Sequence, residues 1–153
     1  MKSADTNVLL YALNEDCVEH EACRPVLDDL ANGGVDWVVA DQVLIELYRL
    51  LRNPSVLERP LTAGKAAEVV DFFDRCGCQR VGYAHDLWPP LRADLGRRGF
   101  AAGRSFDAQL AHTLRAAGVR TLYTRNVRHF ADAGFERLVD PAGSPTLGVQ
   151  ERP

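Results

Sequence analysis

Hydrophobic and polar positions along the chain follow two patterns, one typical of short buried strands and the other of helices. Residues 36–40 form a short apolar, β-branched run, whereas residues 20–30 place apolar side chains at helical intervals. Residues 2–4 have low strand propensity, so their assignment as a strand depends on the apolar helix that follows them. The complete pattern predicts strands at 2–4, 36–40, 79–83, 119–124 and 137–140, and helices at 8–13, 20–30, 42–52, 63–75, from 85 onward, at 105–117 and within 125–133.

Polar residues and glycines mark the expected helix ends. Asp41, Thr62 and Ser105 stand directly before helical segments, where such side chains are favoured as N-caps. Gly118 follows the helix predicted at 105–117 and is a typical helix terminator.

The order of these elements predicts an α/β fold. Short strands that alternate with helices of about ten to fifteen residues form a parallel sheet covered on both faces, which gives three α/β/α layers. Residues 1–140 are expected to be one domain, and the Gly/Pro/Ser-rich residues 141–153 are expected to be a flexible tail.

Composition and charge restrict the possible functions. The chain has 153 residues, of which 46% are hydrophobic, and a formal net charge of −3, which excludes a generally basic nucleic-acid binder. No apolar run approaches the roughly 20 residues of a membrane helix. Asp5 and Asn7 interrupt the amino-terminal apolar segment, which is unlike a secretory signal, so we expect a cytoplasmic protein without membrane contact.

The four cysteines allow two interpretations. Cys17, His20 and Cys23 together with Cys76 and Cys78 raise the possibility of a zinc site. Their spacing matches no common zinc module, and positions three and six residues apart do not share one helix face. Reduced thiols are the preferred interpretation.

Three acidic residues and one asparagine are candidates for chemistry, and each has a purely structural alternative. Asp5 and Asn126 stand where N-caps are favoured. Glu46 is spaced to form a helix-surface pair with Arg49, and Asp107 lies in a first helical turn, where acids are favoured by the helix dipole.

Taken together, these residues predict a metal site. Parallel strands end at the same edge of a sheet, where ligands bind, and Asp5 and residues 124–126 both follow predicted strands. Clustered carboxylates stay ionised together when a cation neutralises them, and oxygen ligands suit Mg²⁺ or Mn²⁺.

At these positions the chain resembles the PIN-domain ribonucleases and, among them, the VapC-type toxins of bacterial toxin–antitoxin pairs. The resemblance extends in order and spacing to about residue 140. The matching stretches are residues 5–12, 43–54, 105–111 and 124–130.

The resemblance implies a three-layer PIN-like fold and a catalytic, metal-binding set of Asp5, Glu46 and Asp107. Asn126 occupies a fourth position at which the family usually has Asp, and His129 stands where another acid is frequent. Asn126 is therefore a fourth candidate metal ligand that lacks the usual charge.

The resemblance also implies an activity and partners. The expected reaction is Mg²⁺- or Mn²⁺-dependent hydrolysis of RNA phosphodiester bonds, and the expected partners are a small cognate antitoxin and a second copy of the chain. The residues expected to position the substrate are Thr124, Asn7 and, in a basic loop, Arg97, Arg98 and Arg104. The structural alternative for that loop is an ordinary solvated surface.

Three other functions remain open at the level of sequence. The chain is alternatively a catalytically impaired PIN-like module that only binds RNA or a partner, or an RNA-processing nuclease that is not a toxin. Phosphoryl transfer through a nucleophilic Asp5 is disfavoured, because the haloacid-dehalogenase pattern requires an acid where this chain has Asn7.

Overall fold

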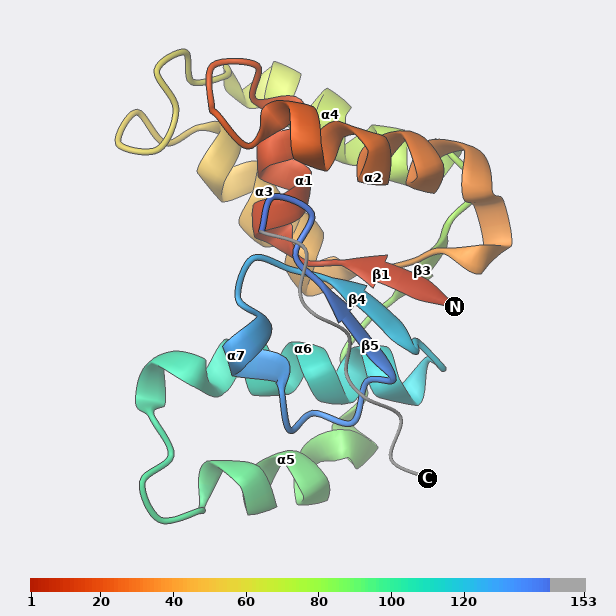
Figure 1. Ribbon diagram of the computed structural model, residues 1–153, viewed down its shortest axis with the longest axis vertical. Coiled ribbons are helices and arrows are strands. Elements are labelled where there is room, and N and C mark those ends of the chain that lie inside the picture. Colours follow the sequence, from red (N-terminus) through yellow and green to blue (C-terminus); the bar gives the residue numbers. More distant parts are fainter. Residues whose placement is uncertain (144–153) are drawn as a thin grey trace.

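Short parallel strands form the centre of the protein in the computed structural model, which describes residues 1–143 (Figure 1). One sheet has the strand order β1-β4-β5 and a second sheet pairs β2 with β3. A parallel bridge between Lys2 and Trp37 connects the two. The strands are β1 (Lys2–Ala4), β2 (Val38–Ala40), β3 (Gln79–Val81), β4 (Thr121–Tyr123) and β5 (Arg137–Val139).

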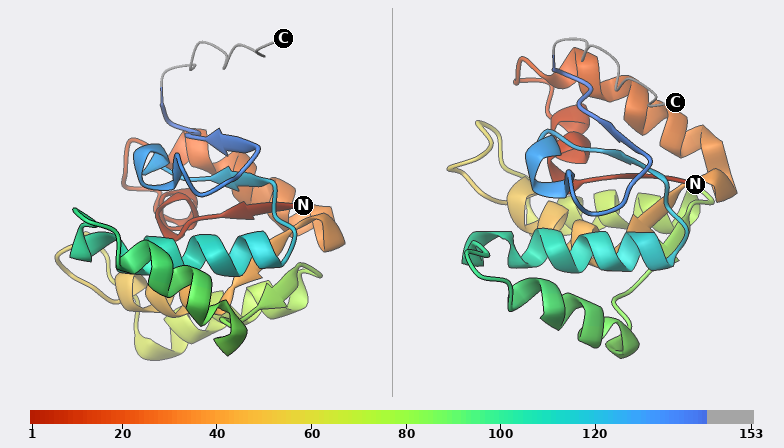
Figure 2. Two further views of the ribbon diagram at one scale, coloured as in Figure 1. Left: turned by 90° about the horizontal axis from the view of Figure 1, so that it is seen from below. Right: turned by 60° about the horizontal axis from the view of Figure 1, so that its bottom comes forward.

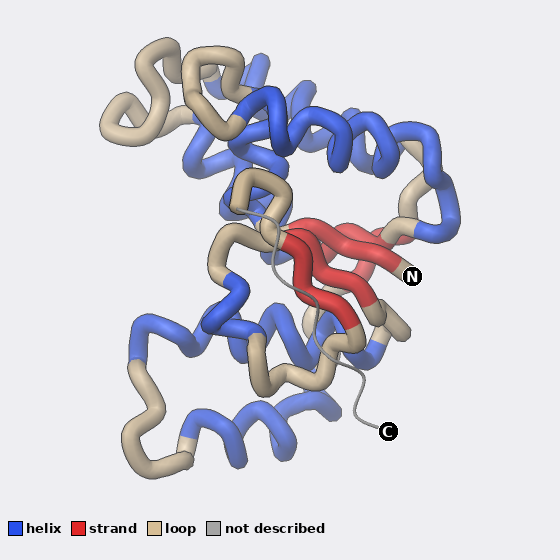
Figure 3. Tube along the Cα trace, in the orientation of Figure 1, coloured by secondary structure: helices blue, strands red, loops and turns tan. Residues whose placement is uncertain are grey.

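The helices lie on both sides of these strands, which confirms the predicted α/β/α layers. Figure 1 shows α1 to α4 in its upper half and α5 to α7 in its lower half, and Figure 3 shows the strands in red between them. The helices are α1 (Thr6–Leu13), α2 (His20–Gly33), α3 (Asp41–Leu51), α4 (Ala63–Arg75), α5 (Trp88–Leu95), α6 (Ser105–Ala116) and α7 (Val127–Phe130), with 3-10 turns at Gly34–Asp36, His85–Leu87 and Ala102–Arg104.

The register of the main sheet determines where the candidate residues lie. Ala4 is paired with Tyr123, and Tyr123 with Val139, so β1, β4 and β5 end level with one another. Asp5 and Thr124 are the next residues along their strands and therefore lie at the same sheet edge. The loops that leave this edge lie to the left of the strands in Figure 1.

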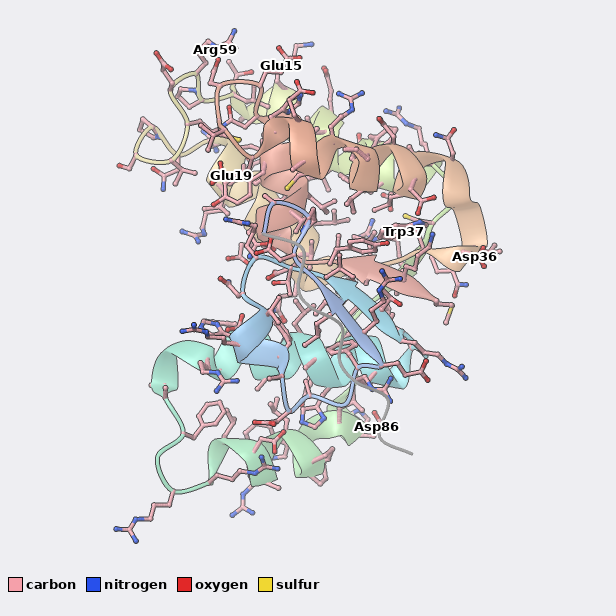
Figure 4. All side chains as sticks on the ribbon, viewed as in Figure 1. Glu15, Glu19, Asp36, Trp37, Arg59 and Asp86 are labelled. Atoms are coloured by element: carbon pink, nitrogen blue, oxygen red, sulfur yellow. The ribbon has the colours of Figure 1, made fainter. Side chains whose placement is uncertain are left out.

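Apolar side chains from both helical layers fill the core around the strands. Val39 and Leu122 are fully buried in the sheets, and Leu9 and Leu114 cover them from α1 and α6. Trp37 is also fully buried (Figure 4), and its ring stacks on Tyr123 at a centroid distance of 5.5 Å. This aromatic pair adds to the connection between the two sheets.

The predicted helix caps are correct at one position and wrong at two. Thr62 accepts a hydrogen bond from the Lys65 backbone N–H at 3.4 Å, as predicted for the N-cap of α4. Asp41 is instead the first residue of α3, and its carboxylate accepts from Arg80 Nε at 3.1 Å. Ser105 is likewise the first residue of α6, because a 3-10 turn leads directly into that helix.

Some element lengths also differ from those predicted from the sequence. The helix predicted at 20–30 continues to Gly33, and the strand predicted at 36–40 begins at Val38, because residues 34–36 form a 3-10 turn. The predicted tail at 141–153 lies outside the described residues from position 144 onward. Within residues 1–143, none of the helices has the length and apolar character required to span a membrane.

All four cysteines are free thiols. The thiol of Cys17 contacts the Tyr11 carbonyl oxygen at 3.8 Å, and His20 Nδ1 lies 3.2 Å from that same oxygen. Cys76 and Cys78 contact the Phe73 carbonyl oxygen at the end of α4. The interpretation as reduced thiols stays a prediction, and no disulfide joins any two of the four cysteines in the structure.

Candidate active site

Asp5 lies at the carboxyl end of β1 and at the start of α1. Its backbone N–H donates to the Tyr123 carbonyl at 2.8 Å, which continues the β1–β4 pairing by one residue. Its carboxylate accepts from the Thr6 backbone N–H at 2.8 Å, from the Thr124 hydroxyl at 2.8 Å and from the Asn7 amide at 3.0 Å. The helix-cap interpretation of Asp5 is therefore correct, and the same carboxylate is also held by β4.

The surroundings of Asp5 disfavour its charged form. The residue is only 6% exposed, and this burial raises the pKa of Asp5 to about 6. The hydrogen bonds from Thr124 and Thr6 lower the pKa, whereas the negative charges of Asp107 and Glu46 raise it further. The charges of the two other predicted acids thus reach Asp5.

Glu46 reaches this region from α3 through the hydroxyl of Thr6. That hydroxyl donates to Glu46 Oε2 at 3.0 Å, while Arg49 lies 4.0 Å from Oε1 in the surface pair expected from the spacing. The helix is amphipathic, with Leu47 buried and Ile45 71% exposed. Glu46 is therefore both a surface residue and a neighbour of Asp5, since Thr6 is bonded to both.

Asp107 lies in the first turn of α6, as predicted, and contacts His129 of α7. The distance from Asp107 Oδ2 to His129 Nδ1 is 2.7 Å, and the Asp107 side chain is 23% exposed. His129 thus provides an imidazole to Asp107 at the position where the family resemblance leads one to expect an acid.

The corner at residues 124–126 is attached to Asp5 by several polar contacts. Thr124 is fully buried, and its hydroxyl oxygen accepts from the Asn126 backbone N–H at 3.0 Å. The side-chain oxygen of Asn7 accepts from the Arg125 backbone N–H at 3.2 Å. A contact of Thr124 or Asn7 with substrate stays a prediction, because their observed contacts connect this corner to Asp5.

Asn126 precedes α7 but does not cap it with its side chain. The residue is exposed at the same edge of the sheet, so its amide oxygen is accessible from solvent. A metal-ligand role for Asn126 stays a prediction.

Arg97, Arg98 and Arg104 all line a cleft beside Asp107. Arg97 forms an ion pair with Asp94 at 2.7 Å, and Arg104 donates to the His129 carbonyl. The structure thus brings the basic loop next to one of the three acids.

A divalent metal ion fits the chemistry of this site. Within the described part of the chain, no three His, Cys, Asp or Glu side chains are already gathered around a metal position. Nevertheless, the donors at this edge are carboxylate and amide oxygens, which Mg²⁺ and Mn²⁺ prefer. Burial, and to a smaller extent the charges of Asp107 and Glu46, disfavour the ionised form of Asp5, and a bound cation would favour that form.

Sequence reasoning missed two contributors to this site. Thr6 links Asp5 to Glu46, and Asp140 pairs with Arg125 at 2.7 Å and so restrains the corner at 124–126. Thr6 lies within the motif that carries the resemblance, but no spacing in the sequence indicates its contact 40 positions away.

Comparison with protein families and sequences identifies similar proteins. Residues 4–136 match the family model of the PIN domain. The chain is 45% identical to Ribonuclease VapC24 of Mycobacterium tuberculosis over 148 residues, which cover 94% of this chain and 99% of that protein. It is 35% identical to Ribonuclease VapC43 of the same species over 71 residues, which cover 46% of this chain and 48% of that protein.

Solved structures share the fold at lower identity. VapC20 of Mycobacterium tuberculosis, a Sarcin-Ricin loop cleaving toxin, has a TM-score of 0.66 at 18% identity. The match covers 88% of this chain and 96% of the VapC20 chain. VapBC2 from Rickettsia felis, bound to a DNA fragment from its promoter, has a TM-score of 0.61 at 20% identity. The match covers 90% of this chain and 96% of the Rickettsia chain. At this identity the likeness concerns the fold alone.

Proposed function

This chain belongs to the PIN-domain family, among the VapC ribonucleases, and on this basis we propose that it is a divalent-metal-dependent endoribonuclease, the toxin of a toxin–antitoxin pair. The observation that carries the proposal is the buried Asp5 carboxylate at the ends of β1 and β4. Burial, and to a smaller extent the charges of Asp107 and Glu46, raise its pKa to about 6, and such a perturbed carboxyl group is typical of functional sites.

Asp5 and Asp107 are the proposed ligands of Mg²⁺ or Mn²⁺, with Glu46 as a ligand either directly or through water. Asn126 is a weaker candidate ligand, because its amide carries no charge. When bound, the ion supplies an activated water and offsets charge on the phosphate. Thr124 and Asn7 orient Asp5 through its Oδ2 atom, which receives both of their hydrogen bonds.

The substrate in this proposal is an RNA phosphodiester. Arg97, Arg98 and Arg104 lie on one side of Asp107, where guanidinium groups can contact phosphates flanking the cleaved bond. The net charge of −3 does not oppose this, because the metal and the arginines make the local field more positive.

The proposed partners are a small cognate antitoxin and a second copy of the chain. Ile45 on α3 and Phe106 on α6 are 71% and 70% exposed, and the Gln42 side chain of α3 donates to the Phe106 carbonyl. Two large exposed apolar side chains on neighbouring helices support a protein interface near the acids. Light scattering of the purified chain is expected to measure twice the mass of one copy, and co-expression with the antitoxin is expected to suppress RNA cleavage.

The test of the activity is cleavage of RNA by the purified protein. Cleavage is expected with Mg²⁺ or Mn²⁺, and it should disappear with excess chelator and in Asp5→Ala. Asp36→Ala is the matched control, because Asp36 is exposed in a 3-10 turn between α2 and β2, away from the site (Figure 4). Unchanged cleavage in Asp5→Ala or in chelator would contradict the proposal.

The alternative of an impaired module has one favourable observation, the contact between His129 and Asp107 where the family often has a second acid. A Mn²⁺ titration separates the two, because only the active nuclease is expected to bind the ion saturably. Sequencing of the RNA ends then distinguishes a toxin with a few cellular targets from a general processing enzyme.

A further inference from the structure

A cleft of about 690 Å³ extends from Asp107 along the lower helical layer of the protein. Its walls are α5, α6, the loop between these two helices, and the segment from α7 to Gly134. Figure 2 shows α5 and α6 side by side as a helical hairpin with this loop at one end. The volume lies within the roughly 300–1,000 Å³ of sites that enclose a small organic ligand, so it is large enough to enclose a nucleotide.

The cleft has an excess of positive charge. Arg98, Arg104 and Arg115 line it, and none of them has a carboxylate partner within residues 1–143. Arg104 and Arg115 donate instead to neutral backbone carbonyls, those of His129 and Val119. The Arg115 guanidinium also lies over the Phe135 ring at 5.8 Å, and no carboxylate within residues 1–143 neutralises it or Arg98, both of which are exposed.

Two of the three acidic residues that line the cleft contact a basic side chain. Asp94 contacts Arg97 at 2.7 Å and His112 at 2.7 Å, and Asp107 contacts His129. Asp132 is the remaining lining carboxylate without an ion-pair partner in the described chain. The cleft thus favours a polyanion over a neutral or cationic ligand.

Phe100 adds an aromatic surface to the same cleft. It lies in the loop between α5 and α6, lines the cleft and is partly exposed. Aromatic rings beside arginines are typical of surfaces that bind unpaired bases, because every base can stack on a ring. A duplex offers its bases only at the groove edges, so an enclosed aromatic wall suits a single strand.

Building on the proposed nuclease function, we propose that this cleft binds single-stranded RNA adjacent to the cleaved phosphodiester. A base stacks on Phe100, while Arg98 and Arg115 contact the neighbouring phosphates. The strand then leaves the acids past His129, since Asp107 and His129 both line the cleft. Phe100 and Arg98 are thus positioning residues for the substrate.

The first test measures binding of a fluorescent single-stranded RNA oligonucleotide to the intact chain in chelator, where no cleavage occurs. Arg98→Ala is compared with Arg92→Ala, since Arg92 is exposed on α5 and does not line the cleft. Arg98→Ala is expected to reduce the slope of log affinity against log salt by about 0.7, the value of one phosphate contact on a single strand. Equal slopes in the two variants would overturn the proposal.

The second test replaces Phe100 with Leu, which retains an apolar side chain and the fold, and with Tyr, which retains the ring. Phe100→Leu is expected to bind the oligonucleotide about tenfold more weakly, whereas Phe100→Tyr stays close to the unmodified protein. The same oligonucleotide annealed into a duplex is expected to bind unmodified protein and Phe100→Leu equally. The proposal would be overturned if Phe100→Leu and Phe100→Tyr lost the same affinity for the single strand, or if neither lost any.

These measurements separate the cleft from the proposed activity. If the protein does not cleave RNA but Arg98→Ala and Phe100→Leu weaken RNA binding as predicted, the nuclease function is contradicted and the RNA-binding cleft is supported. Normal cleavage with no effect of either residue retains the nuclease and overturns the cleft. If Arg98→Ala binds RNA as the unmodified protein does but no longer binds the co-expressed antitoxin, the cleft belongs to a protein partner. This result also overturns the proposal.

Discussion

The hydroxyl of Thr124 donates a hydrogen bond of 2.8 Å to the carboxylate of Asp5, across a sequence separation of 119 residues. Both residues directly follow paired strands, so the β1–β4 register places them opposite one another. The same hydroxyl oxygen accepts from the Asn126 backbone. A single threonine therefore connects the first acid of the site to the corner that carries the fourth candidate ligand.

Replacing this hydroxyl with a methyl group is expected to destabilise the protein. Thr124→Val removes one of the three hydrogen bonds to the Asp5 carboxylate and the acceptor of the part-buried Asn126 backbone N–H. The expected cost is about 1–3 kcal/mol in the free energy of unfolding measured with urea. Thr121→Val, on the neighbouring strand β4, is the control, since the Thr121 side chain makes no hydrogen bond within residues 1–143. The two variants should differ clearly; equal stability would contradict the role given to Thr124.

The metal-free protein is expected to lose stability as the pH rises from about 4 to about 6. The pKa of Asp5 is about 6 in the folded chain and 3.8 in the unfolded chain, so the unfolded chain ionises first and is favoured between these values. The difference corresponds to on the order of 3 kcal/mol, because one pKa unit is worth about 1.4 kcal/mol.

The measurement for this effect is urea unfolding in chelator as a function of pH. Asp5→Asn has no carboxyl group to ionise, so its stability relative to the unmodified protein should increase over the same interval. A constant difference between the two proteins from pH 4 to pH 6 would show that Asp5 does not carry the effect.

Restoring an acid at position 126 is expected to strengthen metal binding. Asn126 is exposed at the edge where Asp5 and Thr124 lie, so Asn126→Asp adds a charged oxygen ligand without a burial penalty. Calorimetry with Mn²⁺ should show a higher affinity or an additional ion bound. Asn53→Asp adds the same charge at an Asn whose side chain already accepts from the Ser55 backbone, away from the acids, and should change neither quantity.

The ion pair between Arg125 and Asp140 is expected to contribute more than the surface pairs. Its side chains are 29% and 22% exposed, and Asp140 holds the pKa of Arg125 above its usual range. Asp140→Asn should reduce the free energy of unfolding by about 1–2 kcal/mol and lower the rate of RNA cleavage. Asp28→Asn breaks the more exposed pair with Arg24 and should cost no more than a few tenths of a kcal/mol in stability.

The hydrophobic pattern predicts the fold because each helix and each strand has its own short-range periodicity, and the order of these elements determines the three layers. The helix at 63–75 and its cap Thr62 agree with the structure, since both are determined by neighbouring residues. Asp41 was predicted as a cap and instead pairs with Arg80, 39 positions away. Such long-range competition for a side chain leaves no local signal.

The same distinction applies to the candidate site. The position of Asp5 follows from strand order, since the ends of parallel strands coincide. The contact of Glu46 with Thr6 and that of Asp107 with His129 depend on how α3 and α7 pack, which periodicity does not determine. The cleft likewise depends on the angle at which the α5–α6 hairpin folds back.

The pairing of β1 with β4 also has a consequence for biosynthesis. Translation produces β1 well before its ladder partner, residues 121–123, because paired residues such as Lys2 and Thr121 are far apart in the sequence. Thr124 in turn donates its backbone N–H to Val139, which follows later still. A nascent chain therefore carries Asp5 with only its local partners Thr6 and Asn7, and the contact with Thr124 forms only after 119 further residues have been made.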